Sequence, residues 1–329
     1  MTGDHQVSSL QSPLTVSEHV WPGETQPLVS VAMITYNQDK FIHQAIDGVL
    51  MQEISFPLEL IIGDDCSTDT TRSIVENYAS RHPNVIRTIL HSSNVGMVSN
   101  CKAVMNLCRG KYIALCEGDD YWTCVHKLHQ QIELLEMNPS ASGCIHRADG
   151  RFEETGEIVP GHFGPDVIKP SYTVDDLLKY GNFVPTASVV YRREVLQKLP
   201  AGPHSDFLML VEAAMAGPLL YLPQSMATYR KHGGGVHTGQ PTAIQIARSL
   251  ETLFVIASHF GLAEKPAFNE GVKFRLRQME EQIFLYEKKI AEQDDRHRDD
   301  SQTIRKIHES KTFKVGRALN RFRNQFKLL

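Results

Sequence analysis

Apolar and polar residues along the first third of the chain alternate in blocks that predict strands followed by helices. Residues 28–35 form an apolar, β-branched run, and the apolar positions of residues 38–52 recur at helical spacing. The order then repeats. Strands are predicted at 58–62, 85–90 and 111–116, one helix is predicted to end before Pro83, and another is predicted over 97–108. Strands that alternate with helices in this way predict an α/β fold, with a mainly parallel sheet and helices on both faces.

The pattern is mixed after the last of these strands. A helix is predicted over residues 125–137, and residues 173–180 are predicted to form a short helix with Thr173 as N-cap and Gly181 just past its end. Residues 183–191 are predicted to form a strand that a proline interrupts. This part of the chain therefore adds both helices and strands to the first, regular part.

From residue 241 onward the pattern is helical. Apolar positions in the last helical segment recur at spacings of four and three, at Val272, Leu276, Met279, Ile283, Tyr286 and Ile290. This is a short heptad seam, which predicts packing against another helix and makes a homo-oligomer through the C-terminal helices one possible outcome.

Composition indicates a globular protein, with 41% hydrophobic and 22% charged residues. No stretch approaches the roughly 20 apolar residues of a spanning helix, and no secretory signal is recognisable, so a cytoplasmic location is expected. The six cysteines have neither disulfide-framework nor zinc-site spacing and are expected to be reduced.

Charge is unevenly placed, because residues 301–329 hold eight Lys or Arg and one Glu in a chain of net charge −4. Aromatic and aliphatic residues are interspersed among these cations. Such a tail predicts binding to an anionic membrane surface at the inner face of the membrane, and the alternatives are packing on a partner subunit or a disordered tail. The absence of a matching basic, aromatic pattern in the rest of the chain argues against nucleic-acid binding.

Polar clusters follow the ends of three predicted parallel strands. They are residues 35–37, residues 64–69 and residues 117–120. Because ligands of α/β sheets bind beyond the carboxyl ends of the strands, these clusters are expected to converge on one edge. The acids of the third cluster suit Mg²⁺ or Mn²⁺ together with a nucleotide diphosphate. The alternative is that the acids are solvated turn residues or helix caps.

Four segments in this order resemble the family 2 glycosyltransferases of the bacterial cell-surface polysaccharide type. They read VSVAMITYN (29–37), IGDDCSTD (62–69), NVG (94–96) and GKYIALCEGDDYW (110–122). The resemblance is close over residues 28–138 and looser through NFVPTAS (182–188), Asp206 and YRKHGGG (229–235). It implies a GT-A fold, Rossmann-like, together with a nucleotide diphosphate sugar donor, a divalent metal and inversion at the anomeric carbon. The C-terminal helical extension is expected from the helical pattern after residue 241 and lies outside the resemblance.

The resemblance also assigns expected roles to single residues. Nucleotide binding is expected of Thr35, Tyr36, Asn37, Asp65, Glu117 and Gly118, with the ring of Tyr36 placed to stack on the base. Metal binding is expected of Asp119, Asp120 and His232, and Asp206 is the expected catalytic base. Weaker expectations place Trp122 and Thr186 at the acceptor. The sequence departs from the family pattern in two places, since Glu117 replaces the more usual Asp and His204-Ser205 precede Asp206 where many members have an acid.

Composition, pattern and the resemblance together divide the chain into four expected regions, of which the first and the last lie outside the resemblance. They are a flexible lead-in over 1–27, a nucleotide-sugar-binding half over 28–120, an acceptor-binding and catalytic-base half over 121–238, and a helical extension with its basic tail over 239–329. The expected acceptor is a hydroxyl of a saccharide or a lipid-linked saccharide.

Other functions fit the sequence less well. A nucleotidyltransferase that makes sugar nucleotides, or a dehydrogenase, would need a glycine-rich phosphate loop after the first strand, and residues 35–40 contain no glycine. A non-catalytic protein that binds nucleotide sugars would keep the binding residues without turnover. The acids at 119, 120 and 206 argue against that alternative, which an activity assay decides.

Overall fold

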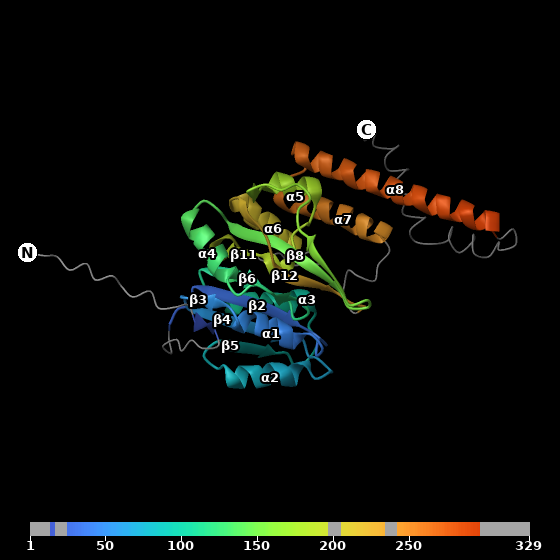
Figure 1. Ribbon diagram of the computed structural model, residues 1–329. Coiled ribbons are helices and arrows are strands. Elements are labelled where there is room, and N and C mark those ends of the chain that lie inside the picture. Colours follow the sequence, from blue (N-terminus) through green and yellow to red (C-terminus); the bar gives the residue numbers. More distant parts are fainter. Residues whose placement is uncertain (1–13, 17–24, 197–204, 234–241, 297–329) are drawn as a thin grey trace, which may run out of the picture. The chain divides into compact units, whose positions relative to one another are not determined.

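The computed structural model describes residues 14–16, 25–196, 205–233 and 242–296 (Figure 1). The chain forms two compact units. The first contains residues up to 171 together with 184–230, and the second contains 172–183 together with the residues from 231 onward. The expected boundary near residue 120 does not separate compact units, so the predicted functional halves stay a prediction.

Strands and helices of the first unit alternate through its first half. In chain order they are β1 (Leu14–Thr15), β2 (Val29–Thr35), α1 (Ile42–Leu50), β3 (Glu53–Ile54), β4 (Leu58–Asp64), α2 (Thr71–Arg81), β5 (Ile86–Leu90), α3 (Met97–Leu107) and β6 (Tyr112–Leu115). The strand and helix order predicted for this half is confirmed, with small differences at the ends.

The second half of this unit is richer in antiparallel strands. Its elements are β7 (Tyr121–Trp122), α4 (Lys127–Met137), β8 (Gly143–Phe152), β9 (Glu157–Phe163), the 3-10 turn η2 (Thr186–Ser188), β11 (Val190–Arg192), the 3-10 turn η3 (Arg193–Leu196), α6 (Ser205–Ala216) and β12 (Leu219–Lys231). The short strand β10 (Ser171–Tyr172) lies where the chain passes to the second unit.

The main sheet of the first unit runs in the order β12, β8, β11, β6, β2, β4, β5. β6, β2, β4 and β5 are parallel neighbours, and β11 joins the sheet antiparallel to both β6 and β8. All seven residues of β4 are buried, as expected for a strand covered on both faces. The helix α3 packs so closely on β4 that a Cβ at Gly63 would lie 2.5 Å from Val104 Cγ2.

Two predictions need correction in this unit. The strand expected over residues 183–191 is replaced by η2 and the short β11, because the carbonyl of Pro185 accepts hydrogen bonds from the amide and the hydroxyl of Ser188 (2.9 and 2.7 Å) and closes a turn. The lead-in expected to be flexible is ordered at residues 14–16, where β1 pairs with β3 and Val16 is fully buried.

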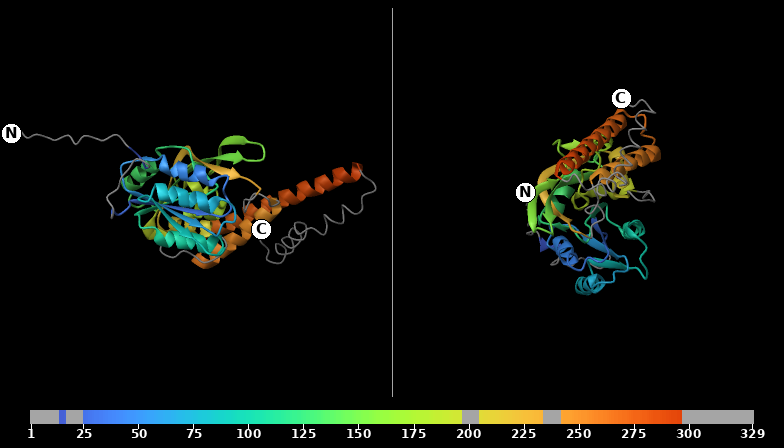
Figure 2. Two further views of the ribbon diagram at one scale, coloured as in Figure 1. Left: turned by 90° about the horizontal axis from the view of Figure 1, so that it is seen from below. Right: turned by 90° about the vertical axis from the view of Figure 1, so that its right-hand side faces the viewer.

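The second unit consists of α5 (Val174–Tyr180), α7 (Thr242–Phe260) and α8 (Pro266–Arg296), the last being the long orange-red helix of Figure 2. The predicted cap of α5 is confirmed, since Thr173 and Asp176 form a capping box. Val272 and Met279 of the heptad seam are buried inside this unit, where α8 packs on α5 and α7. Further along α8, Phe284 and Leu285 are exposed. The basic tail lies outside the described residues.

No helix within the described ranges combines the length and the apolar character needed to cross a membrane.

Candidate functional site

The three polar clusters lie at the carboxyl ends of neighbouring parallel strands. β2 ends at Thr35, β4 ends at Asp64, and the loop after β6 carries residues 117–120. β2 is the central strand of the three, paired in register with β4 on one side and β6 on the other (Figure 1). The sheet therefore brings the clusters to one edge, as the strand pattern predicts.

Asp65 is held by the turn that follows β5. Its carboxylate accepts hydrogen bonds from the backbone amides of Val95 (2.7 Å) and Gly96 (2.9 Å), and its own amide donates to the carbonyl of Thr35 (3.0 Å). The side chain is only 3% exposed. Asp65 is thus a rigid acceptor, and the second lone pair on each oxygen is the part of it that can serve a ligand.

Asn37 joins the first cluster to the second. Its side-chain oxygen accepts a hydrogen bond from the backbone amide of Thr68 (2.7 Å), and its backbone amide donates to the hydroxyl of Ser67 (3.0 Å). Asn37 has a φ of +52°, which asparagine tolerates better than most residues. The neighbouring residue Tyr36 is 44% exposed.

The acidic loop after β6 packs directly against the end of β2. The amide of Gly118 donates to the carbonyl of Ile34 (3.0 Å), and the Thr35 hydroxyl donates to the side-chain oxygen of Gln38 (2.8 Å). A Cβ at position 118 would lie 2.8 Å from Thr35 Oγ1 and 2.5 Å from Gln38 Oε1. A side chain at position 118 would therefore force Gln38 or Thr35 to shift, and glycine lets the loop approach this closely without such a shift.

Three acids come together on this loop and on the first turn of α6. Burial, followed by the charges of Asp119 and Asp206, raises the pKa of the half-buried Glu117 to about 8. The charge of Asp206 also raises the pKa of Cys101 on α3, after burial and the charge of Glu117. Asp206 is therefore close to the acidic loop although 86 residues or more separate the two in the sequence.

Asp120 points into the protein instead. It is 2% exposed, and its Oδ1 accepts the amide of Arg230 (2.9 Å), whereas Oδ2 has no hydrogen-bond partner in the described part of the chain. Burial and the charges of Asp119 and Glu117 raise the pKa of Asp120 well above its ordinary value. Asp120 thus serves first to attach the acidic loop to β12.

Arg230 is the residue that sequence reasoning missed. Its Nε donates to the carbonyl of Asp119 (2.8 Å) and its Nη2 to Gln44 Oε1 (2.6 Å), and its Nη1 pairs with Glu153. The guanidinium also lies over the rings of Phe41 and Tyr121, 4.6 and 5.0 Å from their centroids. Arg230 is nearly buried and fixes the backbone of the acidic loop. Its partners are distant in the sequence, so no local motif could have revealed them.

The expectation that Trp122 forms an acceptor platform is wrong. Trp122 is 1% exposed, its Nε1 donates to the carbonyl of Ala187 (2.9 Å), and the ammonium of Lys127 lies 4.0 Å from the ring centroid. Both faces of the indole are therefore enclosed by the core. Thr186 is half-buried in η2, and its assignment to the acceptor stays a prediction.

The expected metal ligands are not a preformed set. Within the described residues, no group of three or more His, Cys, Asp and Glu side chains is arranged to hold a metal ion. Asp119 and Asp120 share the acidic loop, whereas His232 belongs to the second unit, so its role stays a prediction.

Comparison with known proteins identifies the family of this arrangement. The sequence model described as "Glycosyl transferase family 2" matches residues 30–199. The uncharacterised protein Rv1520 of Mycobacterium tuberculosis is 40% identical over 210 residues. This alignment covers 63% of the present chain and 60% of Rv1520, so the chain spans less than two thirds of that relative's length.

Two solved structures share the fold. The first is S. aureus TarS residues 1–349 in complex with UDP-GlcNAc, with 18% identity, a TM-score of 0.53, and coverage of 76% of this chain and 80% of that one. The second is the mannosyltransferase PcManGT from Pyrobaculum calidifontis in complex with GDP-Man and Mn²⁺, with 19% identity, a TM-score of 0.54, and coverage of 76% and 70%. The predicted GT-A fold with C-terminal helices is confirmed by these likenesses.

Proposed function

Because the chain belongs to glycosyl transferase family 2, we propose that it transfers a sugar from a nucleotide diphosphate donor to a hydroxyl of a saccharide or lipid-linked acceptor, with inversion. One observation carries the proposal: Glu117, Asp119 and Asp206 gather at the carboxyl edge of the parallel strands. Ligands of such sheets bind at this edge. The UDP-GlcNAc and GDP-Man bound to the two structural neighbours also support a nucleotide sugar as donor.

The donor would bind across the ends of β2 and β4. The exposed ring of Tyr36 would stack on the base, while Asn37 and Thr35 hold the loop that carries it. Asp65, fixed by the turn at residues 95–96, would accept a hydrogen bond from the base or the ribose. Gly118 and Glu117 would lie beside the diphosphate, where the missing side chain of glycine permits a close approach.

The acidic loop fits a divalent cation, Mn²⁺ or Mg²⁺. After burial, the charge of Asp119 raises the pKa of both Glu117 and Asp120, and a cation that prefers oxygen ligands relieves such repulsion. Asp119 would hold the ion, and the Oδ2 of Asp120 would be a further candidate ligand. Such ions commonly use one or two protein carboxylates and take further ligands from phosphates, so a set of three protein ligands is not needed. When bound, the ion supplies Lewis-acid stabilisation of the charge on the diphosphate.

Asp206 would act as the general base. An acceptor hydroxyl is a weak nucleophile, and a carboxylate within hydrogen-bond reach can accept its proton while the new C–O bond forms. The proton passes from the acceptor oxygen to the Asp206 carboxylate, and the anomeric carbon loses its bond to the diphosphate. Attack from the face opposite the leaving group inverts the anomeric centre.

Two variants test the proposal without knowledge of the acceptor, because hydrolysis of a sugar nucleotide by water releases the nucleotide diphosphate. Asp119→Ala should remove the Mn²⁺-dependent part of UDP or GDP affinity in titration calorimetry. Asp206→Asn should keep that affinity and lower nucleotide release by about 100-fold, the scale of a lost general base.

Asp166→Asn is the matched control, because Asp166 is an exposed acid of the same unit outside the three clusters. It should leave both affinity and release unchanged. Wild-type release by Asp206→Asn would move the base elsewhere. A wild-type protein that binds neither UDP nor GDP, with or without Mn²⁺, would overturn the proposal.

We also propose a place for the reaction, at the inner face of the membrane. This part rests on the basic tail, whose cations would be attracted to anionic lipids by about 1 kcal/mol each.

A further inference from the structure

A hollow lies at the amino ends of the parallel strands, opposite the carboxyl ends that carry the three polar clusters. It is a hollow of about 770 Å³ lined by residues that precede the parallel strands: Leu28 before β2, Pro57 before β4 and Lys111 before β6. The acidic cluster follows the other ends of these strands. β2 has seven residues, which at about 3.3 Å each separates the two sites by roughly 20 Å. The hollow is therefore distinct from the proposed donor site.

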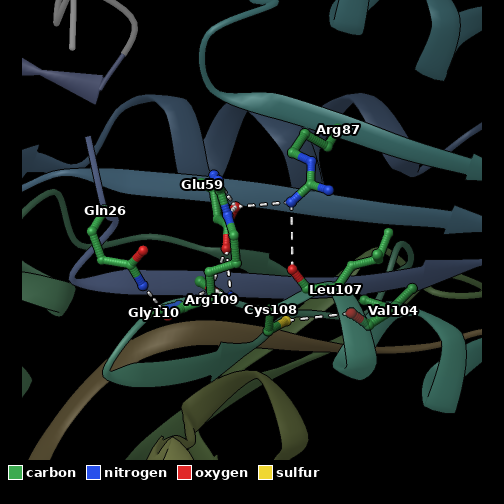
Figure 3. A network of polar contacts seen from close by, with 9 residues as sticks. Gln26, Glu59, Arg87, Val104, Leu107, Cys108, Arg109 and Gly110 are labelled. Carbon is green, nitrogen blue, oxygen red and sulfur yellow. Dashed lines mark hydrogen bonds and ion pairs between the residues drawn. The ribbon is translucent and has the colours of Figure 1, made fainter. Parts of the chain in front are cut away.

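The wall of this hollow is fixed by a buried carboxylate (Figure 3). Glu59, only 3% exposed, accepts hydrogen bonds from the backbone amide of Arg109 (2.8 Å) and from its Nε (3.0 Å), and Arg87 Nη1 adds an ion pair (3.2 Å). Ser30 donates to Glu59 (2.7 Å) and accepts the amides of Arg109 (3.0 Å) and Gly110 (2.8 Å). The side-chain amide of Gln26 donates a hydrogen bond to the carbonyl of Arg109 (2.7 Å) and completes this part of the wall. The recess is thus built by a defined polar network.

The lining of the hollow contains four basic side chains and one acidic side chain. The cations are Arg109, Lys111, Arg192 and Arg193, and the acid is Glu194. Arg109 and Lys111 are about half exposed and pair with carboxylates outside the lining, and Arg192 is buried among carbonyl oxygens. The Lys111–Glu136 pair is exposed on both sides and therefore weak, so Lys111 can exchange partners at little cost. Arg109 stays on the buried Glu59 and contributes a fixed positive charge to the lining.

Arg193 supplies the donors that a ligand would meet. Its Nε donates to the carbonyl of Gly110 (2.8 Å), which orients the guanidinium, while within the described residues its two terminal nitrogens make no hydrogen bond or ion pair. A planar guanidinium held in this way is suited to two parallel bonds with a phosphate or carboxylate.

The remaining wall of the hollow is apolar. It consists of Pro27, Leu28, Phe56 and Pro57, so that cationic donors and an apolar surface face the same space. Small-molecule sites have volumes of roughly 300–1,000 Å³ and combine an apolar lining with a few polar groups that fix orientation. The size and the lining of this hollow meet both conditions.

We propose that this hollow binds a small soluble organic anion, with its phosphate or carboxylate on Arg193 and Arg109 and its apolar part against Phe56 and Leu28. The inference is independent of the proposed transferase function. The lining contains more positive than negative charge, which selects an anion. The apolar wall favours an anion that carries a ring or a hydrocarbon chain over inorganic phosphate.

Phenyl phosphate is the probe, titrated into the full-length protein by ligand-observed NMR with EDTA present, so that no metal recruits phosphate to the acidic edge. A dissociation constant of about 1–10 mM is expected for a ligand of this size. Arg193→Gln should weaken binding by about threefold or more, and Glu194→Gln should tighten it by about twofold, because the first removes an attractive charge and the second a repulsive one.

Two comparisons make the test decisive. Lys102→Gln, which removes an exposed cation from α3 of the same unit, should leave the affinity unchanged. Inorganic phosphate and phenol, each carrying half of the probe's chemistry, should bind more weakly than phenyl phosphate. The proposal is overturned if phenyl phosphate does not bind, if the Arg193 and Glu194 variants bind like wild type, or if inorganic phosphate binds as well as the probe. The opposite directions expected for the two variants exclude misfolding as the explanation of a positive result.

Discussion

Replacing Arg230 by methionine should destabilise the first unit more than any exposed Arg replacement. The Arg230 side chain is 2% exposed, and the change removes one donor each from the Asp119 carbonyl, Gln44 Oε1 and Glu153. Removing one member of a buried ion pair costs about 3–5 kcal/mol. Glu153 is 24% exposed and keeps its bond to Arg151, so the lower end, about 3 kcal/mol, is expected.

Arg151→Met is the matched control, because Arg151 pairs with the same carboxylate at 2.6 Å but is 31% exposed. Its replacement should cost about 0–1 kcal/mol. Urea unfolding followed by Trp122 fluorescence, in a Trp21→Phe background, reports the first unit because Trp122 lies in its core. A difference between the two variants of less than about 1 kcal/mol would refute the idea that burial makes Arg230 a structural centre of the acidic loop.

Two further predictions concern buried positions. Burial lowers the pKa of Lys127 to about 7, so unfolding takes up a proton above that pH, and the free energy of unfolding should rise between pH 7 and 8.5 by up to about 1.4 kcal/mol per unit. Lys127→Met should remove this rise in urea titrations, and an unchanged slope would contradict the assignment. Gly118→Ala should cost about 1–3 kcal/mol and weaken UDP binding, since its Cβ would overlap Gln38. Gly233→Ala, where no described residue lies within 4 Å of the new Cβ, should do neither, and equal behaviour of the two would refute the overlap.

The parallel half of the sheet was predictable because each of its elements carries a local pattern. Strands such as β4 are buried along their whole length and therefore read as continuous apolar runs. The position of the polar clusters then followed from topology alone, since parallel strands end at one edge. The antiparallel half lacks such a pattern. β12 contains a proline and mixes buried with exposed positions, and β8 carries charged residues and two glycines.

Roles that depend on long-range partners could not be predicted. Trp122 follows a candidate binding loop and looks like a sugar platform in the sequence. It is buried because β7 pairs with β12, more than 100 residues away, and because Ala187 and Lys127 close over it. Arg230 lies within the looser part of the family resemblance, but its importance comes from partners on α1 and the acidic loop. Both errors have one cause, since burial depends on distant segments of the chain.

The structure distinguishes the roles of the carboxylates in the two acidic doublets, Asp64-Asp65 and Asp119-Asp120. In the first, Asp64 is fully buried and pairs with Arg72 (2.7 Å), and Asp65 is tied to two amides. In the second, Asp120 is tied to Arg230, whereas Asp119 raises the pKa of Glu117. Mutual repulsion among acids destabilises a folded loop, so an acid that is kept close to others must be compensated by fixed partners elsewhere. The fixed partners are donors: Arg72 holds Asp64, the amides of Val95 and Gly96 hold Asp65, and the amide of Arg230 holds Asp120.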